Sequence, residues 1–93
     1  MALLDLAGRR WTLRVAWELR DAALTFRALQ AACDGVSPTV LNDRLADLRA
    51  AHLVERAAGD GYALTALGRE LVAHVVPLVA WSERWARATF YVA

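Results

Sequence analysis

Lysine is absent from the 93-residue sequence, so all eleven basic side chains are arginines, and ten acidic residues nearly balance them. The net charge of +1 excludes a basic tail, a polybasic membrane patch and an acidic interaction segment. It does not exclude binding to nucleic acid, because a local patch of charge matters more than the sum. The single cysteine excludes an internal disulfide framework and a zinc site built from cysteines.

Motifs for catalysis and metal binding are also lacking. The two histidines, His52 and His74, do not have the spacing of paired metal ligands, so we expect no metal and no cofactor. The sequence contains no glycine-rich phosphate loop, no nucleophile motif of the G-x-S-x-G type and no H-E-x-x-H motif. We therefore do not expect an enzyme.

Long hydrophobic runs are missing as well. The longest uncharged stretch inside the chain, residues 71–82, is too short to span a bilayer and contains His74 and Pro77. Asp5 interrupts the N-terminal apolar segment where a secretory signal needs continuity, so we expect a soluble, cytoplasmic protein. The length allows one domain, residues 1–93, and an apolar content of 58% predicts that some apolar surface is buried between subunits.

Local patterns predict three short helices in the first third of the chain. The first covers residues 2–7, and the second covers 11–20 with apolar side chains on nearly every side, which is typical of the centre of a bundle. Residues 24–26 are extended at most, and Thr25 is a candidate N-cap for a third helix over 27–33.

Residues 37–51 carry the clearest helix signal. Ser37 is a candidate N-cap, Pro38 occupies the first helical position, and Val36 and Leu41 have the spacing of a hydrophobic staple. Leucines repeat along one face, whereas the other face carries small and polar side chains, namely Thr39, Asn42, Asp43, Ala46 and Ala50. Two short helices joined by a glycine-containing turn predict a helix-turn-helix.

A β-hairpin and a long helix complete the predicted fold. The hairpin, or wing, covers residues 53–64, with the Asp60-Gly61 pair as a tight turn. Thr65 then caps a helix over residues 65–89. The fold class is mainly α with a small β-hairpin wing, which is a winged helix-turn-helix.

The last helix has two features of its own. Pro77 lies inside it and predicts a kink or a break near residues 73–76. We expect its apolar side chains to form a dimer interface with those of the N-terminal segment, from Leu3, Leu4, Leu6, Val75, Leu78, Trp81 and Trp85. The alternative for Trp81 and Trp85, one helical turn apart, is the lining of a small-ligand pocket.

Several blocks of the sequence, taken in order, resemble the HxlR-type transcriptional regulators, a branch of the MarR-like winged-helix proteins. They are Gly8-Arg9-Arg10-Trp11-Thr12-Leu13, Leu24-Thr25-Phe26-Arg27-Ala28-Leu29, the segment 35–45, the segment 53–56 and the segment 62–68, followed by Trp81. The resemblance covers roughly residues 5 to 87. It implies a bacterial homodimer whose terminal helices pair across a two-fold axis and whose recognition helices, 37–51, enter successive major grooves of a pseudo-palindromic operator.

The sequence departs from the family pattern at three places. The wing is short, and its tip, 59–61, carries no basic side chain. No cysteine lies within residues 1–6, the stretch that precedes the tryptophan block and holds a redox-sensing cysteine in many relatives. The first turns of the recognition helix offer no outward Arg or Lys.

The expected partners are double-stranded DNA and a second copy of the chain. The free N–H groups of a helix start suit a phosphate, Asn42 suits an adenine edge, Asp43 suits cytosine N4, and arginines suit the DNA backbone. Arg44 has an alternative, because its place at the edge of the leucine stripe also allows an internal bridge. The candidate DNA-binding residues are Arg10, Thr25, Arg27, Ser37, Pro38, Thr39, Asn42, Asp43, Arg44 and Arg56.

Two other functions stay open at this point. The neutral wing and small net charge also fit a winged-helix module for protein interaction or dimerisation without DNA binding. The tryptophan pair also fits a sensor that responds to a small molecule. Cys33 has the spacing of a core residue, and the alternative is a thiol sensor that bridges subunits.

Overall fold

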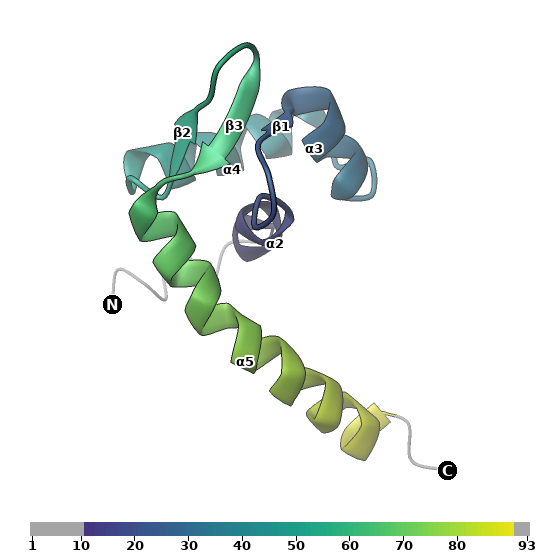
Figure 1. Cartoon of the computed structure of the whole chain (residues 1–93). Helices are drawn as coiled ribbons and strands as arrows, with labels where there is room; N and C mark the ends of the chain where they lie inside the picture. The colour runs from purple at the N-terminus through teal and green to yellow at the C-terminus, as the bar shows by residue number, and fades with distance from the viewer. Residues whose placement is uncertain (1–10, 91–93) are drawn as a thin grey trace.

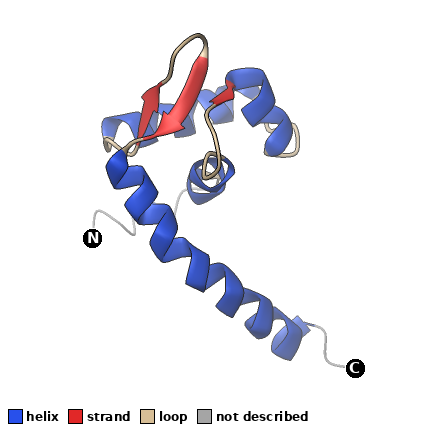
Figure 2. Ribbon diagram, in the orientation of Figure 1, coloured by secondary structure: helices blue, strands red, loops and turns tan. Residues whose placement is uncertain are grey.

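Four helices and three short strands make up the described part of the chain, residues 11–90, of the computed structural model (Figures 1 and 2). The predicted helix over residues 2–7 lies outside the described residues, as do Leu3, Leu4, Leu6 and Arg10. The elements, in chain order, are α2 (Thr12–Glu18), β1 (Leu24–Thr25), α3 (Phe26–Ala32), α4 (Pro38–Ala50), β2 (Val54–Arg56), β3 (Gly61–Leu64) and α5 (Ala66–Phe90).

The predicted helix caps are confirmed. Thr25 Oγ1 accepts a hydrogen bond from the Ala28 backbone N–H at 3.1 Å, and Ser37 Oγ accepts one from the Val40 N–H at 3.2 Å. Thr65 Oγ1 accepts a bond of 3.0 Å from the N–H of Gly68. Each cap satisfies a donor at a helix start that has no partner within its own helix, so each helix begins where the sequence predicts, within one residue.

The hairpin belongs to a three-stranded antiparallel sheet of order β1-β3-β2. Leu24 pairs with Tyr62 in β3, so the segment predicted to be extended at most is an edge strand that ties α3 to the wing. The predicted hairpin turn over 58–61 is present with Asp60 in it, but Gly61 is not part of it. Gly61 already belongs to β3, Ala57 N–H donates to Gly61 O, and the left-handed glycine of the loop is Gly59, with φ of 74°.

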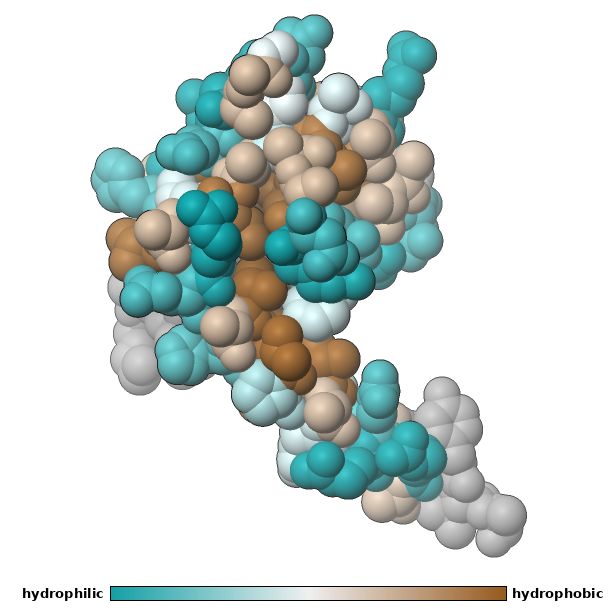
Figure 3. Space-filling view, viewed as in Figure 1, coloured by the Kyte–Doolittle hydropathy of each residue, from teal (hydrophilic) through white to brown (hydrophobic). Residues whose placement is uncertain are grey.

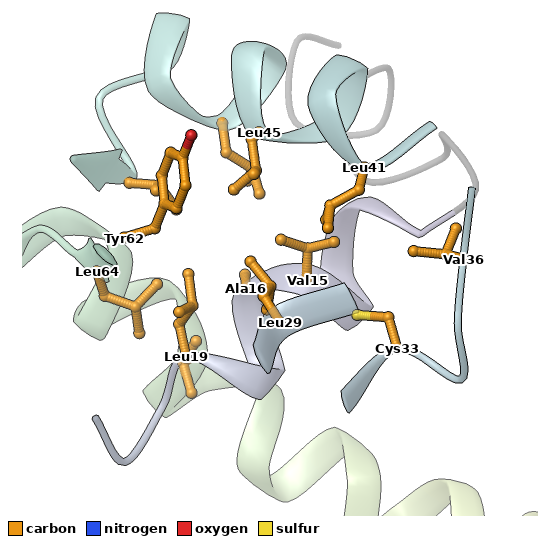
Figure 4. Packing of buried hydrophobic residues seen from close by; sticks show 13 residues of the cluster. Val15, Ala16, Leu19, Leu29, Cys33, Val36, Leu41, Leu45, Tyr62 and Leu64 are labelled. Carbon is orange, nitrogen blue, oxygen red and sulfur yellow. The ribbon is translucent and has the colours of Figure 1, made fainter. Parts of the chain in front are cut away.

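One hydrophobic core lies between the helices and the sheet. Figure 4 shows Val15 and Ala16 from α2, and Leu19 directly after it, in the centre of the core, with leucines of α3 and α4 packed around them. Leu29 and Leu41 are both fully buried. The short α2 therefore has the central place that its apolar composition predicts, and it packs against α3, α4 and α5.

The long helix α5 runs without interruption through Pro77. The predicted break near residues 73–76 is therefore wrong, because the helix keeps its other backbone bonds although proline supplies no N–H. Its first turns pack on α2 and β3, and its C-terminal half extends away from the body (Figure 1). Within residues 11–90, no helix has the combination of length and apolar character that crossing a membrane requires.

Candidate nucleic-acid interface

The turn between α3 and α4 holds the two helices in a fixed relation. Asp34 and Gly35 have φ of 58° and 71°, and the N–H groups of both donate back to carbonyls in the last turn of α3. This is the Schellman arrangement that ends many helices. The Gln30 side chain also donates to Val36 O at 2.9 Å. The helix-turn-helix is thus held by bonds at both sides of its turn.

The helix α4 turns two different faces to core and solvent. Leu41, Leu45 and Leu48 are buried. The stripe on the other side consists only of exposed side chains, namely Thr39, Asn42, Asp43, Ala46, Arg49 and Ala50. A surface with small and polar side chains over about three turns of helix can approach another molecule closely and offer hydrogen bonds to it.

Ser37 and Pro38 are exposed at the start of α4, and Thr25 is exposed at the start of α3. The predicted site residues of the two helix starts and of the α4 stripe are therefore accessible to a partner. Arg49 belongs to the same stripe, although it is not among the residues predicted from the sequence to bind DNA. Its spacing of seven residues from Asn42, two helical turns, was the available signal.

The candidate arginines have different environments. Arg27 is exposed and has no ion pair within the described residues. Arg44 is half-buried, and its Nε lies 3.3 Å from Asp47 Oδ2 one turn along α4, so it takes the internal bridge of its two predicted alternatives. Arg56 donates to the Tyr62 hydroxyl at 3.2 Å and lies over the Tyr62 ring, 5.0 Å from its centroid.

Arg14 is not a candidate for DNA binding, because its contacts lie within the fold. Arg14 Nε lies 2.8 Å from Glu18 Oε1, and its NH2 group donates to Ala32 O at 2.8 Å and lies 3.4 Å from Asp34 Oδ2. The hydrogen bond to Glu18 raises the pKa of the Arg14 guanidinium. Arg14 therefore links α2 to the end of α3, directly before the turn of the helix-turn-helix.

The predicted dimer residues that the structure describes lie on α5. Val75 is half-buried, and the others, Leu78, Trp81 and Trp85, are about half exposed. The two tryptophan rings stack at 5.9 Å with an interplanar angle of 8°. Figure 3 shows hydrophobic side chains gathered along the middle of α5, below the body of the domain. Two surface grooves, one between α4 and β2 and one beside the first turns of α5, are lined by residues other than Trp81 and Trp85.

Cys33 is fully buried among Val15, Leu29 and the other core side chains. Burial raises the pKa of the Cys33 thiol, and the nearby Arg14 guanidinium opposes this shift only in part. Both effects of burial, lost access and a raised pKa, reduce the reactivity of a thiol. The structure therefore favours the core interpretation of this cysteine. Within residues 11–90, no group of His, Cys, Asp and Glu side chains could hold a metal ion.

In the native protein, Cys33 should react with Ellman's reagent about 100-fold more slowly than in denaturant, because the reagent needs both access and a thiolate. The rate is followed by absorbance with and without urea. As a control, the exposed Ala31 of the same helix is changed to cysteine, Ala31→Cys, in a Cys33→Ala chain, and should react rapidly when native. A native rate for Cys33 equal to that of this control would contradict its burial.

Solved structures of transcriptional regulators share this fold. Quinone-bound YodB, a transcriptional regulator of B. subtilis, is 28% identical over 89% of this chain and 93% of its own, with a TM-score of 0.81. A possible HxlR family transcriptional factor from Thermoplasma volcanium GSS1 is 29% identical over 91% of this chain and 82% of its own, with a TM-score of 0.83. No protein with a curated description matches the sequence.

The winged helix-turn-helix fold predicted from the sequence is confirmed by these neighbours, which are transcriptional regulators rather than enzymes. The model of the HxlR-like helix-turn-helix family matches residues 6–90, nearly the whole chain. The protein therefore belongs to the HxlR-like helix-turn-helix family of transcriptional regulators.

Proposed function

We propose that this protein is a sequence-specific regulator that binds double-stranded DNA as a homodimer, on a pseudo-palindromic operator in the bacterial cytoplasm. The observation that carries the proposal is the exposed stripe of α4 beside a rigid turn. The family supports it, because its members are transcriptional regulators.

The stripe has the dimensions and chemistry for a major groove. From Thr39 to Ala50 it extends roughly 16 Å along the helix axis, at 1.5 Å per residue. The N-terminal end of α4 would enter the groove first, as in other helix-turn-helix proteins. Asn42 can then form two hydrogen bonds with an adenine, and Asp43 can accept one from cytosine N4.

Backbone contacts would come from the helix starts and from unpaired cations. Arg27 near the start of α3 and Arg56 on the wing are the best placed of the predicted arginines, because no ion pair within the described residues neutralises them. Arg44 contributes less, since Asp47 already compensates its charge. The wing tip, with Asp60 and no cation, is not expected to enter the minor groove.

The double variant Thr39→Ala, Asn42→Ala should lose sequence preference while keeping general affinity for DNA. Each base contact with good geometry contributes roughly 1–3 kcal/mol of discrimination, so the ratio of operator to random-duplex affinity should fall about tenfold or more. The operator is first selected from a random oligonucleotide pool, and both affinities are measured by fluorescence anisotropy. Glu83→Ala, at an exposed position about 160° around α5 from Trp85, is the control.

The same titration tests the alternative functions. Wild-type protein that shows no salt-dependent binding to any duplex at micromolar concentration would instead favour an interaction module. An unchanged preference in the double variant would contradict our assignment of the reading surface to α4.

A further inference from the structure

A groove separates the C-terminal half of α4 from the strand β2. Its volume is about 600 Å³. The methyl groups of Ala46 and Ala50 lie on the α4 side together with Arg49, and Glu55 and Arg56 lie on the strand side. His52, at the junction between the two elements, also lines it.

The groove continues the exposed stripe of α4. Ala46 lies one helical turn after Asn42 and Asp43, and Ala50 lies one turn further along the same face. The groove therefore opens on the side of the molecule that presents the candidate base-reading residues. A molecule seated along that stripe would also cover the groove.

The groove is lined by two arginines, Arg49 and Arg56, and one carboxylate, Glu55. Arg49 and Arg56 have no ion pair within the part of the chain that the structure describes, whereas Arg14, Arg20 and Arg44 all have one. Because two arginines outnumber the single carboxylate of the lining, the groove has a positive local potential although the net charge of the chain is only +1.

The sheet gives Arg56 its position. Arg56 pairs with Tyr62, and Val54 pairs with Leu64, so these four side chains share the face of the sheet that packs toward α4. Figure 4 shows Tyr62 with its hydroxyl group pointing toward α4. The hydroxyl and the ring of Tyr62 hold the Arg56 guanidinium at this edge, which reduces the conformational entropy that it would lose on binding an anion.

We propose that this groove binds a phosphodiester group of the DNA backbone between Arg49 and Arg56. The inference rests on the proposed function. It adds a contact with the DNA backbone at the C-terminal end of α4. The small side chains of Ala46 and Ala50 leave the groove open between the two arginines. Glu55 also lines the groove, although its side chain points to the other face of β2 from Arg56, and its negative charge lowers the affinity by repulsion.

The variant Arg49→Gln should weaken binding of wild-type operator roughly tenfold at low salt, the effect of one charge-assisted hydrogen bond. It should also reduce the slope of log affinity against log salt by about 1, equally for operator and random duplex, because one phosphate contact is lost. Glu55→Gln should strengthen DNA binding, because it removes a negative charge from the groove. Arg87→Gln, an exposed arginine near the end of α5, is the matched charge control and should change neither quantity by as much.

The outcomes separate this inference from the proposed function. Failure of the wild-type protein to bind any duplex would overturn both. Normal wild-type binding, with Arg49→Gln indistinguishable from Arg87→Gln in slope and affinity, would overturn only the groove. Inorganic phosphate should displace the duplex no better than chloride at equal ionic strength, and preferential displacement would identify a small-phosphate site and overturn the DNA assignment. Circular dichroism and thermal melting of each variant verify that it is folded.

Discussion

Replacing Gly68 with alanine should lower the free energy of unfolding by about 2–3 kcal/mol, although alanine is the better helix former. A Cβ atom at position 68 would overlap the carbonyl oxygen of Leu53 and lie 3.0 Å from its carbonyl carbon. It would also lie 3.1 Å from a methyl group of Leu64. Two of these three atoms belong to the backbone and cannot rotate away, so α5 would have to move.

The close approach at Gly68 matters because three elements meet there. The α4 helix ends in a Schellman motif in which His52 has φ of 60° and Leu53 N–H donates to Leu48 O. The carbonyls of His52 and Leu53 then accept bonds of 2.6 Å and 3.0 Å from the side chain and backbone N–H of Thr65. Moving α5 breaks these bonds, which fix the long helix relative to the helix-turn-helix.

Thermal melting at one fixed protein concentration tests this prediction, with an expected decrease in Tm of about 10–20 °C. Gly59→Ala is the matched control, because Gly59 has φ of 74° and open space around its Cβ position. That variant should lose only about 1–2 kcal/mol, the cost of a left-handed conformation for a residue with a Cβ. A Gly68→Ala protein as stable as this control would contradict the close contact.

Most of the helices could be predicted from the sequence because their signals are local. Ser37 and Pro38 mark the start of α4, Thr65 marks the start of α5, and each signal acts within one turn of the helix that it begins. The family blocks place these helices in a winged order, which the structure confirms.

Features that depend on long-range packing could not be predicted in this way. The two residues of β1 are too few to give a strand pattern, and only their pairing with β3 makes them a strand. The wing loop has its left-handed glycine at Gly59 although the Asp60-Gly61 pair is the stronger local signal. The sequence left two alternatives for Arg44, and only the structure shows its ion pair with Asp47. The groove beside Arg49 depends on the packing of β2 against α4, which the periodicity of one helix does not reveal.

One face of α5 carries the other large expected effect, which is on assembly. Leu67, Leu78, Trp81 and Trp85 lie within about 60° of one another around the helix and are each 48–59% exposed in the single chain. Monomeric soluble proteins rarely expose several large apolar side chains on one helix face. The tryptophan content of this face is typical of an interface centre, so we propose that a second copy of the chain covers it.

The variant Leu78→Glu should therefore raise the dimer dissociation constant about 100-fold or more, because association would bury an uncompensated charge. Operator affinity should fall with it, since a monomer engages only one half-site. Sedimentation velocity across a concentration series measures the first effect, and anisotropy measures the second. Ala80→Glu adds the same charge about 200° around the helix and should leave both unchanged. Because Leu78 is largely exposed, the monomer should keep its helical circular dichroism, and a Leu78→Glu protein that remained a dimer would show that the two copies meet elsewhere.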